Sequence, residues 1–188
     1  MKKRGSGSMY NVPYVHPYYL TRPMYVQPMY GQFPQEMYQP YQQYPYLEMN
    51  RVLRDHGKQP YVVNIEDATK KNKTFRTAIW TGNHLQVTLM SIGVGADIGL
   101  EVHPHVDQFL RIEDGQGIVM MGDSRDHLDF ERRVGEDDAI MVPAGKWHNI
   151  VNTGRKPLKL YSIYAPPEHP FGTVHRTKRD AMHHHHHQ

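Results

Sequence analysis

Two short stretches of the chain carry side chains suited to binding one metal ion. In the first, Glu101 and His103 are two residues apart and Gln108 follows; in the second, a Pro-x-Gly turn leads into His148. Side chains two apart on a strand share a face, so Glu101 and His103 are expected to point the same way. A barrel brings successive strands side by side. The sequence therefore predicts one metal site made by Glu101, His103, Gln108 and His148.

This ligand set favours a divalent transition metal. Imidazole nitrogen with carboxylate and amide oxygen suits manganese, iron(II), nickel, cobalt or zinc. The chain has no cysteine, which excludes thiolate ligands and disulfides. Because Gln108 is neutral, the protein supplies a single negative charge through Glu101, and the bound ion stays a strong Lewis acid. Four ligands on an octahedral ion leave two positions for water, O2 or a chelating substrate.

Several neighbouring side chains have alternative roles. His105, next to Pro104, is an alternative ligand or a residue at the rim of the site. Tyr164 or Arg111 could reach a substrate carboxylate or phosphate, but Arg111 is three residues from Gln108 and is expected on the opposite face. The sequence singles out no catalytic residue. A barrel that has lost its metal and keeps only the fold is the competing interpretation, although Glu and Gln both retain donor oxygens.

The elements that must position these ligands are short strands. Leu85, Val87 and Leu89 alternate with Gln, Thr and Met, which predicts a half-buried strand. Further strands, each bounded by Gly, Asp or Asn, are expected over residues 61–65, 74–80, 100–103, 108–112, 117–121, 128–134, 139–142, 148–151 and 158–164. No helical period separates them, so the sequence predicts an all-β sandwich or barrel over residues 61–178.

The two stretches resemble the paired motifs of the cupin superfamily. Its usual motifs are Gly-x5-His-x-His-x3–4-Glu-x6-Gly and Gly-x5-Pro-x-Gly-x2-His-x3-Asn. This chain keeps the positions Gly95, His103, Gly115, Pro143, Gly145, His148 and Asn152. It departs where Glu101 replaces the first His, Gln108 replaces the Glu, and Asp137 replaces the Gly that opens the second motif.

The resemblance implies a fold and a range of chemistries. It covers residues 61–178 and implies a double-stranded β-helix, the jelly-roll barrel of cupins, in which barrels commonly pair as homodimers. Residues 98–113 and 164–175 are similar to small single-domain bacterial cupins of the mannose-6-phosphate isomerase-like group. Dioxygenase and isomerase chemistry on a small oxygenated molecule are both compatible with such a site.

A segment of different composition precedes the expected barrel. Residues 9–46 hold ten of the thirteen tyrosines and seven of the fourteen prolines, set among Gln and Met. Leu, Ile and Val are almost absent, so residues 1–46 are predicted to be a disordered arm. The arm resembles those of bacterial endospore coat proteins, which implies adhesion or dityrosine cross-linking in a coat or surface assembly. A passive linker is the alternative.

The two remaining segments flank the barrel. Residues 47–60 are expected to be a linker or a short helix that Gly57 and Pro60 end. Residues 179–188 are expected to be a disordered His-rich tail. Its five-histidine run, His183–His187, is either an added tag or a native metal-binding tail. His169 and His175, before the tail, are either additional ligands or, as we expect, residues of surface loops.

Composition excludes some classes of function. A formal net charge of +3, with basic residues scattered, gives no reason to expect nucleic-acid binding. No stretch approaches the roughly 18 apolar residues of a membrane helix, and no apolar region follows the basic N-terminus as in a secretion signal. We expect a protein that is cytoplasmic at synthesis, with the spore coat as a later location. It is either a metal-binding cupin that takes a small-molecule ligand or a structural coat component.

Overall fold

The computed structural model describes residues 53–184, and side chains as far as residue 182. The predicted arm at 1–46, residues 47–52 of the next segment, and the last four residues of the tail lie outside this range. Residues 53–60 form turns and loops, without a helix. Within the described range, neither helix has the length and hydropathy that crossing a membrane requires.

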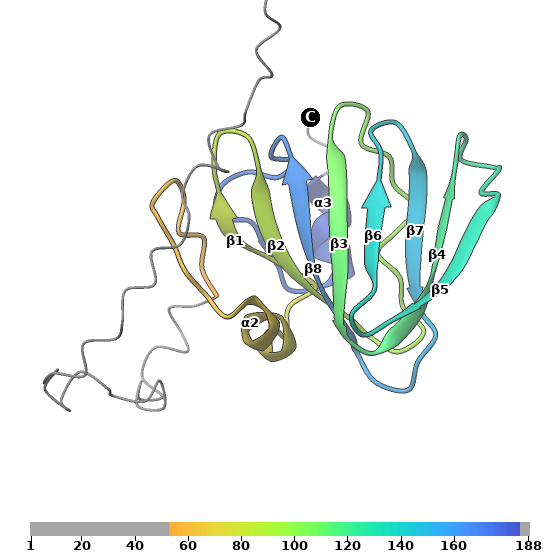
Figure 1. The fold of residues 1–188 in the computed structure, drawn as a ribbon, viewed down its shortest axis with the longest axis horizontal. Coiled ribbons are helices and arrows are strands. Elements are labelled where there is room, and N and C mark those ends of the chain that lie inside the picture. The colour runs from red at the N-terminus through yellow and green to blue at the C-terminus, as the bar shows by residue number, and fades with distance from the viewer. Residues whose placement is uncertain (1–52, 185–188) are drawn as a thin grey trace, which may run out of the picture. The chain divides into compact units, whose positions relative to one another are not determined.

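Two antiparallel sheets form the barrel (Figure 1). The larger sheet has the strand order β6-β3-β8-β2-β1-β9, and the smaller has the order β5-β4-β7. The strands of the described part are β1 (Arg76–Thr81), β2 (Gln86–Ile92), β3 (Asp107–Asp114), β4 (Gln116–Gly122), β5 (Phe130–Gly135), β6 (Ala139–Val142), β7 (Trp147–Asn152), β8 (Leu158–Ala165) and β9 (Val174–His175). The prediction of an all-β jelly-roll barrel is confirmed.

The prediction of a strand is wrong for two segments. Residues 100–103 form no regular strand, and Glu101 makes a single β-bridge with His148 instead. Residues 61–64 form no regular element and lead into helix α2 (Ile65–Lys71). The β-branched residues suggested a strand, but Asn64 caps the helix by accepting a hydrogen bond from the backbone N–H of Asp67 at 3.0 Å. An Asn cap followed by acidic residues in the first turn favours a helix start.

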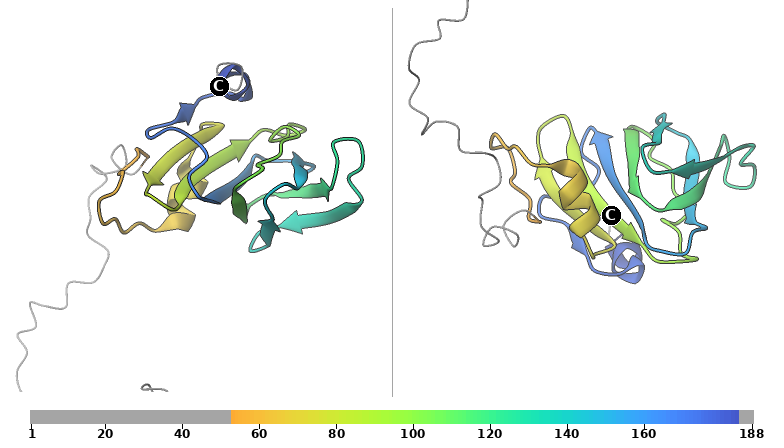
Figure 2. Two further views of the ribbon diagram at one scale, coloured as in Figure 1. Left: turned by 90° about the horizontal axis from the view of Figure 1, so that it is seen from above. Right: turned by 60° about the horizontal axis from the view of Figure 1, so that its bottom comes forward.

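Helix α3 (Lys178–His184) occupies most of the segment that was expected to be disordered. Its Ala181 is buried in the main hydrophobic cluster of the barrel, which includes Phe75. The Lys178 ammonium group donates to Asp97 at 2.7 Å. Figure 2 shows α2 and α3 on opposite faces of the larger sheet. On the α2 side, a second hydrophobic cluster joins Ala68 of the helix to Ile79 of β1 and Leu89 of β2.

Both faces of β2 are therefore covered, whereas a half-buried strand was expected. Leu89 faces α2, while Gln86, Thr88 and Met90 are buried on the other face, inside the barrel. Two polar side chains thus occupy the interior, and the simple rule that apolar positions point inward fails for this strand. These polar side chains lie at the same end of the barrel interior as the predicted ligand Gln108.

The interior changes character along the strands β2, β3 and β8, which are paired with one another. Directly opposed residues on paired strands project from the same face, so the pairing defines layers. One end is apolar and contains Met90, Ile92, Leu110, Ile112, Leu158 and Leu160, all fully buried. The other end is polar and contains Gln86, Thr88, Gln108, Ser162 and Tyr164, also buried. The predicted ligand Gln108 belongs to the polar end.

Candidate metal centre

A pair of backbone hydrogen bonds fixes two of the predicted ligands against each other. The Glu101 N–H donates to the His148 carbonyl at 3.0 Å, and the His148 N–H donates to the Glu101 carbonyl at 2.9 Å. Residues that exchange both bonds lie directly opposite, so their side chains leave the same side of the pair. The single bridge therefore does what the expected strand would have done.

His103 completes a cluster of three potential ligands. Its carbonyl accepts from the Gly145 N–H at 2.9 Å, which ties it to the turn before His148. One ligand atom from each of Glu101, His103 and His148 lies within 4.8 Å of the others. The Nε2 atoms of both imidazoles are 3.5 Å from the same Glu101 oxygen, Oε1. That distance exceeds the usual 2.7–3.2 Å of an N–H···O hydrogen bond.

The second nitrogen of each imidazole is held by the protein. His103 Nδ1 lies 3.1 Å from Oε1 of Glu168, and His148 Nδ1 lies 3.0 Å from the carbonyl oxygen of Lys146. A carboxylate or carbonyl that accepts from Nδ1–H fixes the tautomer with a lone pair on Nε2. Both rings are thus oriented with Nε2 toward the cluster, as in metal-ligating histidines.

Gln108 is oriented in the same way. It lies on the interior face of β3 with Leu110 and opposite Tyr164 of β8. Its amide nitrogen donates to the Ser162 hydroxyl at 2.9 Å. In this orientation of the amide, the carbonyl oxygen Oε1 has no hydrogen-bond partner among the described residues.

The four predicted ligands share one feature. Oε1 of Glu101, Nε2 of His103, Oε1 of Gln108 and Nε2 of His148 are all buried, and none has a hydrogen-bond partner within residues 53–184. Leaving one buried polar atom unpaired costs about 1–3 kcal/mol. Four such atoms at one end of a barrel are available to an external partner, whether water or an ion. Two imidazoles, a carboxylate and an amide oxygen fit a divalent metal ion.

The electrostatics of the cluster keep Glu101 ionised. Burial acts to raise the pKa of Glu101, but His103, His148 and the Arg76 guanidinium together hold it well below its ordinary value. Burial acts to lower the pKa of His103, and the carboxylates of Glu101 and Glu168 outweigh it and raise that pKa to about 9. Metal binding displaces protons from its ligands, so an ion and a proton compete for His103.

No other histidine of the described region belongs to this three-ligand group. His105 is exposed on the turn before β3 and does not belong to the three-ligand group. His169 and His175 are buried, so the expectation of surface loops is wrong for both. Gln86 holds the backbone of His169 through two hydrogen bonds, at 2.8 and 2.9 Å. That pairing fastens the segment after β8, which carries Glu168, to the polar end of the barrel.

The motif positions outside the cluster shape the backbone. Gly145, with φ of 81°, and Gly115, with φ of 91°, adopt the left-handed conformation that favours glycine. Asp137, which replaces a motif glycine, adopts the same conformation with φ of 71°. Asn152 bonds through its side chain to the carbonyls of Ile92 and Lys156, each at 2.9 Å, and so has a structural role.

Two residues at the site were not singled out from the sequence. Glu168 lies in a proline-rich segment where no periodicity points to a role. Arg76 is fully buried in β1, and its Nη2 lies 4.0 Å from Glu101 Oε2. Burial acts against its charge, but Tyr164 and Glu101 keep the pKa of Arg76 above its ordinary value. Arg76 is the only charged residue of its strand, and that feature of the sequence could have pointed to a role at the site.

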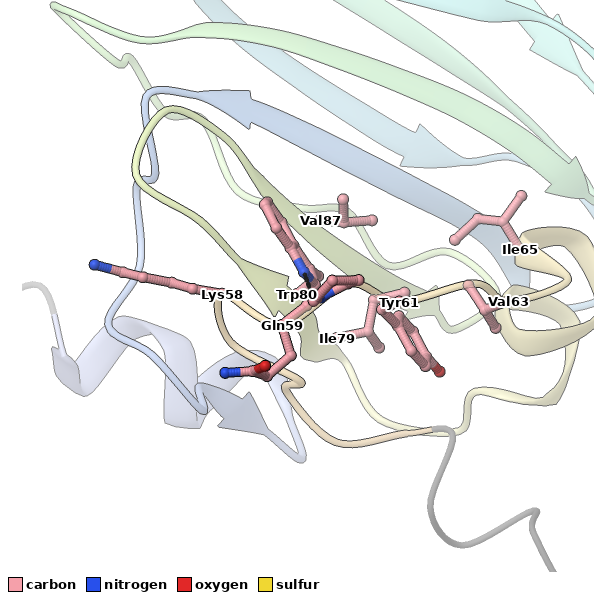
Figure 3. Close-up of a pocket in the computed structure, with 9 residues that line it drawn as sticks. Lys58, Gln59, Tyr61, Val63, Ile65, Ile79, Trp80 and Val87 are labelled. Atoms are coloured by element: carbon pink, nitrogen blue, oxygen red, sulfur yellow. Dashed lines mark hydrogen bonds between the residues drawn. The ribbon is translucent and has the colours of Figure 1, made fainter.

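A separate cavity of about 460 Å³ lies on the other side of the larger sheet (Figure 3). It is an open pocket between the segment before α2 and strands β1 and β2, and its lining includes Tyr61, Val63, Ile79, Trp80 and Val87. The Trp80 indole N–H donates to the Gln59 carbonyl at 2.8 Å, which holds the two walls together. None of the four predicted metal ligands lines this pocket, whose wall is mainly apolar.

Several known proteins are similar to this chain. The cupin domain matches residues 88–164, which contain all four predicted ligands. YrkC of Bacillus subtilis is 61% identical over 171 residues, covering 88% of this chain and 92% of YrkC. Protein L612 of Acanthamoeba polyphaga mimivirus is 42% identical over 117 residues, covering 62% of this chain and 71% of L612.

A solved structure shares the architecture. BH2720 of Bacillus halodurans is 66% identical, with a TM-score of 0.69, over 69% of this chain and 98% of that one. The narrower resemblance to the mannose-6-phosphate isomerase-like group stays a prediction. The motifs, the barrel, the domain match and the relatives together show that this chain belongs to the cupin family.

Proposed function

We propose that this cupin binds one divalent metal ion through Glu101, His103, Gln108 and His148, and that it binds or acts on a small oxygenated molecule there. The observation that carries the proposal is the matched orientation of His103, Gln108 and His148. Each has one polar atom held by the protein, and the other buried and unpartnered among the described residues. Groups fixed in this way are preorganised for a ligand.

The residues define what the site can do. The ion would supply Lewis-acid chemistry, and manganese, iron(II), nickel, cobalt and zinc all suit the donors. His103 and His148 would hold their rotamers through Glu168 and the Lys146 carbonyl, while Gln108 would add an uncharged oxygen. Tyr164, whose ring stands edge-on to that of His103 at 5.6 Å, would border the ligand. Dioxygenase-type and isomerase-type chemistry both remain compatible with this arrangement.

Metal titration of the full-length protein tests the proposal. The five histidines His183–His187 are replaced by serine so that they do not bind the added ion. Isothermal titration with manganese, cobalt and zinc should then give one tight site per chain, which His148→Ala removes. His127→Ala, which changes an exposed histidine, is the matched control and should leave the site intact. Absence of a stoichiometric site, or a site that survives His148→Ala, would refute the proposal.

Assembly through the arm is a second candidate function, and it lies on residues outside the described range. The ten tyrosines of residues 9–46 support it. The YrkC match covers more of this chain than residues 53–188 can supply and therefore extends into the arm. If barrels pair as homodimers, each particle would present two arms and bind a multivalent surface more tightly.

Oxidative cross-linking and sedimentation test that second function. After treatment with peroxidase and peroxide, the wild-type chain should show dityrosine fluorescence and covalent oligomers. A full-length variant with the ten arm tyrosines changed to phenylalanine should show neither. Sedimentation velocity should give a dimer for both proteins. Equal cross-linking of the two proteins would contradict the role of the arm, and a monomer would contradict the pairing.

A further inference from the structure

A buried arginine, Arg76, lies beside the predicted metal ligand Glu101. Arg76 is 1% exposed and pairs in register with Met90 of β2 and His175 of β9, which places it on the interior face of the larger sheet. Its guanidinium lies over the ring of Phe75, 5.6 Å from the ring centroid. A buried charge is costly unless it is paired and hydrogen-bonded, so the partners of this guanidinium decide what it does.

Two nitrogen atoms of the Arg76 guanidinium are available to donate hydrogen bonds. Nε and Nη2 of Arg76 are buried and make no hydrogen bond to any residue between 53 and 184. The carboxylate oxygen Oε2 of Glu101 is 4.0 Å from Nη2, which is too long for a hydrogen bond. Nε and Nη2 lie on one edge of the planar group, and two N–H donors on such an edge match the two oxygens of a carboxylate or phosphate.

A second donor and the balance of charge point to the same kind of ligand. The Tyr164 hydroxyl is buried and has no hydrogen-bond partner in the described part of the chain, while its ring contacts that of His103. A divalent ion would bring two positive charges and Arg76 a third, against the carboxylates of Glu101 and Glu168. The filled site would therefore carry an excess of positive charge, which an anion neutralises.

We propose that Arg76 and Tyr164 form an anion-binding subsite beside the predicted metal ligands. The natural ligand would be a small oxygenated anion that bridges the metal ion and the Arg76 guanidinium. This inference rests on the proposed function, because the ion supplies the second point of attachment. Glu101 and Glu168 are 17% and 24% exposed, so this end of the barrel opens to solvent on the side of the cluster. A carboxylate and a phosphate both have the required oxygens.

Ligand titration of the manganese-loaded, full-length protein tests the subsite, again with serine in place of His183–His187. Glycolate, its neutral analogue glycolamide, and inorganic phosphate are added separately, and the water-proton relaxation rate reports displacement of water from the ion. Manganese affinity is measured in the same samples. The variants are Arg76→Gln and Tyr164→Phe, and the matched control is Arg133→Gln, which changes an exposed arginine.

We expect at least one of the two anions to bind more tightly than glycolamide, and the preferred anion to identify the ligand class. Arg76→Gln should lower the affinity for that anion by about 10- to 100-fold, because it removes charged hydrogen bonds. Tyr164→Phe should lower that affinity by a smaller factor, because it removes a neutral hydrogen bond. Glycolamide binding should not change. Manganese affinity should stay equal or rise in Arg76→Gln, because a cation next to the ion has been removed.

Other outcomes would overturn the inference. If Arg76 only holds Glu101 in place, Arg76→Gln would lower manganese affinity and leave anion binding unchanged relative to glycolamide. If Arg76→Gln does not fold, as judged by circular dichroism, the comparison of anion with amide in wild type and in Tyr164→Phe decides. Failure of the wild-type chain to bind manganese would overturn the proposed function itself. Manganese binding without any preference for an anion would overturn this inference alone.

Discussion

The two ends of the barrel interior are built on the same three strands and have opposite chemistry. At one end β2, β3 and β8 contribute Met90, Ile112 and Leu160, which are fully buried in one apolar cluster. At the other end the same strands contribute Gln86, Gln108 and Tyr164, equally buried but polar. The backbone and its pairing are continuous between them, so side-chain identity alone separates an end that stabilises the fold from one that can bind a ligand.

The difference also predicts how each end contributes to stability. The apolar end gains free energy from burial and close packing, without an external partner. The polar end carries buried groups that are unpartnered within the described residues, which costs free energy until an ion or ligand satisfies them. Substitutions at the apolar end should therefore change unfolding, and substitutions at the polar end should change ligand binding.

The largest expected effect is at the apolar end. Leu160→Ala should lower the free energy of unfolding by about 2–5 kcal/mol, because it opens a cavity at a fully buried position. Urea unfolding followed by circular dichroism measures the change. Leu85→Ala, at a partly exposed position, is the control and should cost much less. Similar losses for the two variants would show that the interior cluster is not the main source of stability.

At the polar end, Glu168→Gln should weaken metal binding by about 10- to 100-fold, the usual effect of removing a partner that orients a ligating histidine. Glu168 orients His103 through Nδ1. Isothermal titration measures the affinity, and Glu131→Gln, at an exposed position on β5, is the control. An unchanged affinity would show that Glu168 does not orient a ligand.

Gln108→Glu should sharpen the contrast by strengthening the polar end. A second carboxylate would raise the affinity for a divalent ion by about tenfold, since ligand charge tunes affinity in oxygen-rich sites. The Ser162 hydroxyl can still pair with the new side chain by donating to it. Gln116→Glu, at an exposed position on β4, controls for the added charge. Weaker binding by Gln108→Glu would place Gln108 outside the ligand set.

The smallest expected effect is at helix α3, which is attached to the barrel by the Lys178–Asp97 ion pair. Burial acts to raise the pKa of Asp97, but Lys178 and the Gly99 N–H lower it below its ordinary value. The stabilisation is therefore complete above the unfolded-state pKa, about 3.9, and is lost as the pH falls through the lower folded-state pKa.

Accordingly, Lys178→Ala should cost about 0.2–1 kcal/mol at neutral pH, and the difference from wild type should shrink below the unfolded-state pKa of Asp97. Thermal unfolding at a series of pH values measures this. Lys146→Ala, which breaks the exposed pair with Asp123, is the control, and its effect should be smaller. A difference that grows on acidification would contradict the sign of the Asp97 shift.

The sequence predicted the barrel, and the convergence of Glu101, His103 and His148, better than the elements around them. Spacing identified Glu101 and His103, because a period of two holds even where a single bridge replaces a strand. It misjudged residues 61–65, where the Asn64 cap outweighs β-branched composition, and α3, whose Ala181 is stabilised by burial against the barrel. Glu168 reaches His103 only through the tertiary fold, so no local pattern could reveal it.

Anomalous scattering from crystals would locate the bound metal ion and its ligands. In crystals of the full-length protein grown with zinc, data collected on both sides of the zinc edge should show one strong peak inside the barrel. We expect ligand distances of about 2.0–2.2 Å to Nε2 of His103 and His148 and to Oε1 of Glu101 and Gln108. A barrel without a peak, with Glu101 paired directly to Arg76 or Gln108 turned away from the imidazoles, would contradict the proposed metal site.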